Sequence, residues 1–152
     1  MEIGLKLLKK LYVNLNINLS KKYFLLFLLP LSFIFTYGKY RCTHSSFKDP
    51  LEKMIGIGEL DGWSVTHLMF FMLVGYIYPN TLLQTCIMGI LWELFEHFYG
   101  EYRPGWLGGY GDCNNLATDK INGNWWYGKW TDILCNLIGF TIGMIIHNKI
   151  PY

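Results

Sequence analysis

Glu93 and Glu96 lie in an otherwise apolar stretch of this chain, and a second apolar stretch opens with Asp132 and Asn136. A charged side chain at membrane depth costs roughly 2.5 to 3.5 kcal/mol on insertion scales, and such groups usually face a bundle interior, where a partner or a metal ion offsets that cost. Carboxylate and amide oxygens suit a hard divalent cation such as calcium, magnesium or manganese. These four side chains are therefore the first candidates for a working site.

The spacing of these residues puts each pair on one face of a helix. Glu93 and Glu96 are three positions apart, and Asp132 and Asn136 are four apart, so each pair projects from a single side. A di-iron bundle would need Glu-x-x-His on two helices. Glu93 is followed three positions later by Glu96, which argues against that kind of site. His97 lies one turn from Glu93 and is an accessory candidate ligand.

Composition predicts an all-α integral membrane protein made of one small domain. Of the 152 residues, 52% are apolar and only 16% are charged, and one helical span needs about 20 mostly apolar residues. Four spans are predicted, at about 22–38, 64–78, 81–98 and 130–147. The connections are then short, so we expect a basic amphipathic segment over residues 1–22 and a single four-span membrane domain over residues 23–152.

The basic N-terminal segment has two periodicities. Up to Tyr12, apolar residues recur at three and four positions opposite lysines, as in a helix that lies in the membrane interface. Beyond Tyr12, apolar residues alternate with asparagines, which is typical of a strand. A cleavable signal peptide is another interpretation. The length of the basic region and the lack of a small-residue cleavage pattern favour a retained anchor.

The lysines also predict the orientation of the chain. The positive-inside rule places the basic N-terminal segment in the cytoplasm, and four spans return the C-terminus to the same side. His67 then lies one turn inside the second span, level with the glutamates that end the third span and with the polar pair that opens the fourth. Five chemically capable side chains at one membrane depth favour a shared site over separate structural roles.

Each of these residues also has a purely structural interpretation. His67 could be a hydrogen-bonded core histidine. The two glutamates could pair with Arg103 or Lys129 at the membrane interface, and Asp132 could cap the fourth helix, since aspartate is favoured there. Only the joint placement of the residues distinguishes the two interpretations at this stage.

The sequence also bears on macromolecular partners. The net charge is only +2, and no arginine-rich patch interleaved with aromatics is present, so we expect no nucleic-acid binding. Gly139 and Gly143 form a G-x-x-x-G pattern, which lets another helix approach closely and is expected to serve packing. A homodimer through these glycines could enlarge the wall of a small lipid cleft.

This arrangement resembles the base-exchange phosphatidylserine synthases of eukaryotes over about residues 61–144. That family shows a histidine early in one span, a W-E-x-x-E sequence at the end of the next, a tryptophan pair, and a D-[IV]-L-x-C-N-like segment before glycines. The matching residues here are His67, Trp92-Glu93-Leu94-Phe95-Glu96, Trp125-Trp126, and Thr131-Asp-Ile-Leu-Cys-Asn136 followed by Gly139 and Gly143.

The resemblance implies an activity and assigns roles. The implied reaction replaces the choline of phosphatidylcholine, or the ethanolamine of phosphatidylethanolamine, with free L-serine to give phosphatidylserine. By the same resemblance, Glu93, Glu96 and Asp132 form a divalent-cation site, expected to bind calcium. Asn136 becomes a phosphate or metal contact and His67 the catalytic histidine. An endoplasmic-reticulum-type membrane is implied if the protein works in a eukaryotic cell.

The chain departs from the family pattern in two respects. Family members are much longer and have many more spans, so this chain corresponds to a reduced core. Where the family has acids on both sides of its tryptophan pair, this chain has Asn122-Gly-Asn124 and Tyr127. Asp112 and Asp119, in the preceding loop, are the candidates to replace those acids.

A second hypothesis comes from a different class of protein. The same four spans would also fit a non-catalytic membrane protein, either a lipid-binding scaffold or a relative of the small teicoplanin-resistance-type membrane proteins. The geometry of the acidic residues separates the two hypotheses. For the enzyme hypothesis we expect the carboxylates of Glu93, Glu96 and Asp132 to meet within one coordination sphere.

Overall fold

The computed structural model describes residues 21–43, 50–52, 55, 60–102 and 127–150. Within these ranges the chain is all-helical, with four α-helices, one short 3₁₀ helix and no strand. The elements are α2 (Lys21–Thr43), η1 (Pro50–Glu52), α3 (Gly62–Ile77), α4 (Leu82–Tyr102) and α5 (Trp130–Lys149). The four predicted helices are confirmed, and α2 and α4 run several residues past their predicted ends. The predicted basic segment at 1–22 falls almost wholly outside the described residues.

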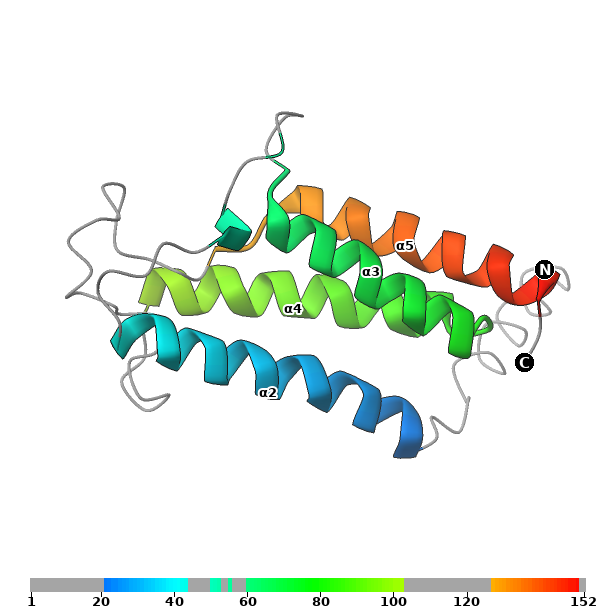
Figure 1. Ribbon diagram of the computed structural model, residues 1–152, viewed down its shortest axis with the longest axis horizontal. Helices are drawn as coiled ribbons and strands as arrows, with labels where there is room; N and C mark the ends of the chain where they lie inside the picture. Colours follow the sequence, from blue (N-terminus) through cyan, green and yellow to red (C-terminus); the bar gives the residue numbers. More distant parts are fainter. Residues whose placement is uncertain (1–20, 44–49, 53–54, 56–59, 103–126, 151–152) are drawn as a thin grey trace, which may run out of the picture.

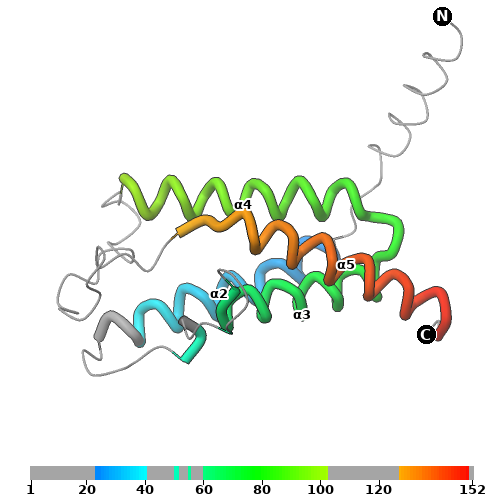
Figure 2. Tube along the Cα trace, turned by 90° about the horizontal axis from the view of Figure 1, so that it is seen from above, coloured from blue at the N-terminus to red at the C-terminus, as the bar shows by residue number. Residues whose placement is uncertain are grey.

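The four α-helices run alternately in opposite directions along the long axis of the molecule (Figure 1). The start of α2 and the end of α5 therefore lie at one end of the bundle, as the view from above also shows (Figure 2). The opposite end gathers the starts of α3 and α5 and the end of α4. The candidate residues His67, Glu93, Glu96 and Asp132 belong to those three helix ends, which explains how they come together.

Local sequence defines both ends of α3. Asp61 is its N-cap: the carboxylate accepts a hydrogen bond from the Ser64 N–H at 3.0 Å, and the Ser64 hydroxyl lies 3.5 Å from the Asp61 N–H. This reciprocal pair is a capping box, which satisfies two backbone donors at the helix start. At the other end Pro79 disfavours a helical conformation for the residue before it, so α3 ends at Ile77.

Glycines allow α3 and α5 to pack closely. Gly139 lies against the carbonyl of Leu68, Gly143 against the carbonyl of Met72, and a Cβ at either position would overlap that backbone. Gly75 of α3 lies equally close to the α5 backbone. The predicted close helix approach is confirmed, but the partner is α3 of the same chain. This glycine face is therefore occupied by α3.

The helix α2 joins the bundle through long aromatic side chains. Tyr23, at the start of α2, is buried with Phe71, Val74 and Phe140, and its hydroxyl lies 2.9 Å from that of Thr85. Towards the other end of α2, Tyr37 meets the ring of Trp63 edge to face, with centroids 5.7 Å apart, in a second cluster built around Tyr99. Side chains rather than close backbone contact thus hold α2, in contrast to α5.

Two of the four helices are long and apolar enough to cross a membrane, namely α2 over Tyr23–Tyr40 and α5 over Trp130–Lys149. The helix α3 is apolar but shorter than a membrane span. The helix α4 carries three glutamates and is not among the helices that are apolar enough to cross a membrane. Large apolar side chains face outwards on all four helices; examples are Leu29, Met69, Leu94 and Ile138. The length and composition of two helices thus give weak support for a membrane protein.

Candidate functional site

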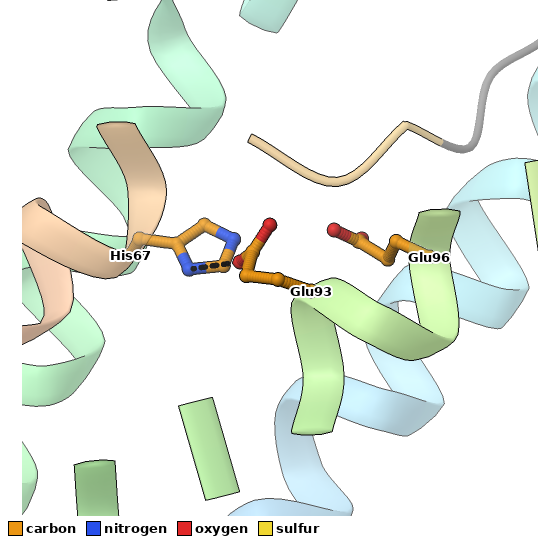
Figure 3. Close-up of side chains that lie close together, drawn as sticks. All are labelled: His67, Glu93 and Glu96. Carbon is orange, nitrogen blue, oxygen red and sulfur yellow. Dashed lines mark ion pairs between the residues drawn. The ribbon is translucent and has the colours of Figure 1, made fainter. Parts of the chain in front are cut away.

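His67 of α3 and the two glutamates of α4 form a group at the end of the bundle where α3 and α5 begin. One ligand atom from each of His67, Glu93 and Glu96 lies within 4.8 Å of those of the other two. The His67 Nδ1 is 3.7 Å from the Glu93 Oε1. The three side chains point into one shared space (Figure 3). An imidazole and two carboxylates at such distances can bind a metal ion or move a proton.

A hydrogen bond to Asn136 orients the His67 ring. The His67 Nδ1 lies 2.9 Å from the Asn136 Oδ1. An amide oxygen only accepts hydrogen bonds, so the His67 Nδ1 is the donor and carries the proton. In the neutral ring the Nε2 is then unprotonated and able to act as a base. In Figure 3 this second ring nitrogen faces the glutamates.

Glu93 is buried, and one of its oxygens has no hydrogen-bond donor. The backbone N–H of Lys129 donates to the Glu93 Oε2 at 2.9 Å, and the Glu93 side chain is only 5% exposed. Within the described residues its Oε1 has no hydrogen-bond partner, and the same is true of the Asn136 Nδ2. An unsatisfied buried oxygen costs about 1 to 3 kcal/mol or more. A cation or a substrate hydroxyl at this position would remove that cost.

Glu96 lies one turn further along α4 and borders a cavity that is partly open to the surface. The Trp92 side chain donates a hydrogen bond to the Glu96 carboxylate. The cavity has a volume of about 310 Å³ and lies between α2, α3 and α4. Apart from His67, Glu96 and Thr66, its lining side chains are apolar or aromatic; they are Phe27, Pro30, Leu31, Phe33, Ile34, Trp63, Phe70, Phe71, Met88, Leu91, Trp92 and Phe95.

Asp132 stands beside the histidine–glutamate group without joining it. The hydroxyl of Ser64 donates to the Asp132 Oδ1 at 2.5 Å, and Asp132 is 3% exposed. It is near enough for its charge to act on both glutamates. The group found by geometry thus contains His67 where the sequence predicted Asp132. The residue that caps α5 is Lys129, and Asp132 lies inside the first turn of the helix.

A second polar cluster, formed by Asp61, Tyr127 and Lys129, lies beside the site where α3 and α5 begin. The ammonium of Lys129 pairs with the Asp61 carboxylate, to which the Tyr127 hydroxyl also donates at 3.3 Å. Burial raises the pKa of Asp61, but hydrogen bonds from Lys129 and Ser64 outweigh that effect, so the pKa lies below its usual value. The Lys129 side chain thus pairs with Asp61, while only its backbone contacts Glu93.

Sequence reasoning missed the role of Asp61. The signal was the sequence Asp61-Gly-Trp-Ser64, which is a capping-box pattern at the start of a predicted helix. That pattern predicts an aspartate at the N-cap of α3, the end of the helix where the site lies. It does not predict the pairing of Asp61 with Lys129, because these residues are 68 positions apart and meet only in the folded bundle.

The accessory candidates do not add to the site as described. The His97 side chain is 69% exposed, and its Nε2 lies 3.6 Å from the Glu101 Oε2 on the outside of α4. His97 is therefore not a ligand in this arrangement. Asp112 and Asp119 lie outside the described residues, as do Arg103 and the pair Trp125-Trp126.

Comparisons with protein-family models, with curated proteins and with solved structures find no match to this chain. The function is therefore argued from the site itself.

Proposed function

We propose that the protein is a membrane enzyme that exchanges phospholipid head groups. L-serine would replace the choline of phosphatidylcholine or the ethanolamine of phosphatidylethanolamine, giving phosphatidylserine. The observation that carries this proposal is the meeting of His67, Glu93 and Glu96 beside an apolar cavity. A phospholipid likewise combines a polar part, the anionic phosphate, with apolar acyl chains next to it. The resemblance to base-exchange synthases, given above, supports this reaction among the phosphoryl transfers that such a site could perform.

His67 is the proposed general base. Its Nε2 accepts the proton of the serine hydroxyl as the serine oxygen forms a bond to phosphorus. The bond between phosphorus and the choline or ethanolamine oxygen breaks, and that oxygen takes the proton from His67 and leaves as the free alcohol. Atoms and charge balance without a nucleotide or an oxidant. Asn136 serves the reaction by holding the His67 Nδ1–H, which keeps the Nε2 available.

The residues of the site fit a divalent cation, and the resemblance favours calcium. Glu93 and Glu96 supply carboxylate oxygens, and the buried Glu93 Oε1 lacks a donor within the described chain. Hard cations prefer oxygen ligands of this kind. Asp132 is a third carboxyl group close by. A cation held by the two glutamates would neutralise negative charge on the phosphate oxygens.

The test is incorporation of labelled L-serine into lipid by the purified full-length protein in phosphatidylcholine or phosphatidylethanolamine vesicles. The assay is run with calcium, with magnesium or manganese, and with a chelator. We expect calcium-dependent formation of phosphatidylserine, and we expect release of one choline or ethanolamine per serine incorporated.

The chain provides matched controls for each role. His67→Gln should reduce incorporation to background, whereas His97→Gln, which changes an exposed histidine on α4, should leave it unchanged. Glu93→Gln should act like His67→Gln, and Glu101→Gln like His97→Gln. Wild type at background with every donor and cation would refute exchange and favour the non-catalytic lipid-binding alternative.

A further inference from the structure

We propose that the cavity between α2, α3 and α4 binds part of one acyl chain of the lipid whose phosphate reacts beside His67, at the proposed cation site of Glu93 and Glu96. This inference rests on the proposed function, because it concerns the lipid substrate of that site. It adds where the apolar part of the lipid lies, which helices hold it, and that a single chain is taken up.

The wall of the cavity suits a hydrocarbon chain. Apart from Thr66, His67, Glu96 and the indole N–H groups of Trp63 and Trp92, the lining side chains are apolar. The Thr66 hydroxyl already donates to the Trp63 carbonyl at 2.7 Å and needs no ligand. His67 and Glu96 are therefore the lining residues that would meet the polar part of a ligand. A ligand that fills this space must be apolar except where it meets those two residues.

The antiparallel helices give the cavity a direction. Towards the site end of the bundle it is lined by Trp63 of α3, Glu96 of α4 and Ile34 of α2. Towards the middle of the bundle it is lined by residues further along α3 and earlier on α2 and α4, namely Phe70, Phe71, Phe27 and Met88. A chain that enters beside the polar group therefore runs from the helix ends towards the centre of the bundle, as an acyl chain runs into a bilayer.

The size of the cavity allows only part of one chain. Its volume of about 310 Å³ is at the lower end of the roughly 300 to 1,000 Å³ of sites that enclose drug-sized ligands. A whole phospholipid is larger than such ligands. Phe33 lines the cavity and is also 54% exposed, so the cavity reaches the outer surface of α2. The second chain can therefore remain in the surrounding lipid.

The packing of α2 explains why the space exists. Tyr23 attaches one end of α2 through its hydrogen bond to Thr85, and Tyr37 attaches the other end through its contact with Trp63. Between these two attachments, the middle of α2 around Pro30 and Leu31 faces the cavity. A helix held at both ends leaves room for a chain between its middle part and α4.

The test uses phosphatidylcholine with a photoreactive diazirine in one acyl chain, mixed in equal amount with the full-length protein in detergent micelles. After illumination, the labelled positions are mapped by mass spectrometry. Met88 lines the cavity, whereas Met69 is 58% exposed on the outside of α3. We expect labelling at Met88 to exceed labelling at Met69 at least severalfold, and unlabelled phosphatidylcholine to suppress it.

Two tryptophan substitutions in α2 provide a matched pair. Leu31→Trp places a large ring in the cavity and should abolish labelling near Met88. Leu29→Trp places the same ring on the exposed face, where Leu29 is 68% exposed, and should leave labelling unchanged. Circular dichroism checks that both variants keep their helices. If Leu31→Trp does not fold, the comparison of Met88 with Met69 in wild type still decides the question.

Failure of this inference can be told apart from failure of the proposed function. Equal labelling of Met88 and Met69 in wild type, or full labelling at Met88 in folded Leu31→Trp, would overturn the acyl-chain site whatever the enzyme activity. Selective labelling at Met88 without any serine incorporation would support the chain site and count against head-group exchange. His97→Gln, which changes an exposed histidine outside the cavity, should keep the labelling.

Discussion

Lys129 connects three helix ends at the site through two different groups. Its backbone N–H donates to Glu93 of α4 at 2.9 Å, and its ammonium pairs with Asp61, the N-cap of α3. Lys129 is itself the N-cap residue of α5. Displacing its side chain should therefore shift the donor that holds Glu93. Asp61, which touches neither lipid nor metal in the proposed reaction, is in this sense a positioning residue.

Replacing Asp61 should make stability depend less on acid pH. The folded-state pKa of Asp61 is lowered, so its stabilising effect is complete above the usual aspartate pKa of about 3.9 and is lost as pH falls through the lower folded-state value. Asp61→Asn should cost on the order of 3 kcal/mol near neutral pH, since it leaves Lys129 without its buried partner. Thermal unfolding in detergent from pH 3 to pH 7 measures this difference.

The pH course of that difference distinguishes an ion pair from simple packing. The gap between wild type and Asp61→Asn should begin to shrink below about pH 4, where Asp61 of the unfolded chain takes up a proton, and should close as pH falls through the lower folded-state pKa of Asp61. Glu101→Gln, an exposed change, should match wild type throughout. A gap of constant size at all pH values would contradict the assigned role of Asp61.

Asn136 should affect turnover more than serine binding. Asn136→Leu removes the acceptor for the His67 Nδ1–H, so the ring can place its proton on the Nε2 and lose its function as a base. Because general-base catalysis contributes about 10² to 10⁴ in rate, we expect kcat to fall on the order of 100-fold with a smaller change in the KM for serine. Asn136→Asp, which keeps an acceptor oxygen, should recover part of the rate. Equal rates for wild type and Asn136→Leu would refute this role.

At the scale of elements, the tight α3–α5 pair is the frame of the site. It carries His67 on one helix and Asn136 and Asp132 on the other, and two hydrogen bonds join them across the interface. The glycines of α5 make this distance possible, because any side chain at Gly139 or Gly143 would meet the α3 backbone. The position of His67, Asn136 and Asp132 relative to one another thus depends on glycines that have no reactive side chain.

The substitution Gly143→Ala tests the close packing of α3 against α5, because ordinary helix propensity and this packing predict opposite changes in stability. In an ordinary helix interior, replacing glycine with alanine stabilises by roughly 0.5 to 1 kcal/mol. Here the added Cβ would overlap the Met72 carbonyl, so we expect a loss of about 1 to 3 kcal/mol, as for other overpacked cores. Ile145→Ala on the exposed face of α5 is the control. Thermal unfolding in detergent that shows Gly143→Ala to be more stable than wild type would contradict the packing described here.

Much of the arrangement of elements follows from the sequence, and the exceptions have physical causes. Hydropathy and the Pro79 turn predict four alternating helices, and alternation alone brings His67 and Glu93 to the same end. Which carboxylate joins His67 is not predictable in this way, because it depends on side-chain rotamers and on the Ser64 hydroxyl that engages Asp132. The cavity is likewise not predictable from the sequence, because it arises from space left beside the middle of α2.

At the scale of the whole molecule, the bundle has a polar end and an apolar outer surface. The charged and polar groups of the site gather where α3 and α5 begin, while exposed leucines and isoleucines cover the flanks of the helices. The described chain starts and finishes at the opposite end of the bundle (Figure 1). If the bundle crosses a membrane, the start of α2 and the end of α5 lie towards one side, and the site lies towards the other.

Reporter fusions test this arrangement in cells. Reporters whose signal depends on the side of the membrane, fused to either terminus, should report the same side, because the four helices alternate in direction. The protein should also remain with membranes after alkaline carbonate extraction. Release of the protein by carbonate, or opposite signals from the two fusions, would contradict a four-span arrangement.

The most direct test of the central claim, that the two glutamates beside His67 form one cation site, is calcium titration by isothermal calorimetry. The full-length protein is held in lipid nanodiscs and compared with Glu93→Gln, Glu96→Gln and Glu101→Gln, which change three glutamates on the same helix. We predict one calcium ion bound by wild type and by Glu101→Gln, and at least a tenfold weaker affinity in each of the other two. Equal affinity in all four proteins, or no binding by wild type, would contradict the claim.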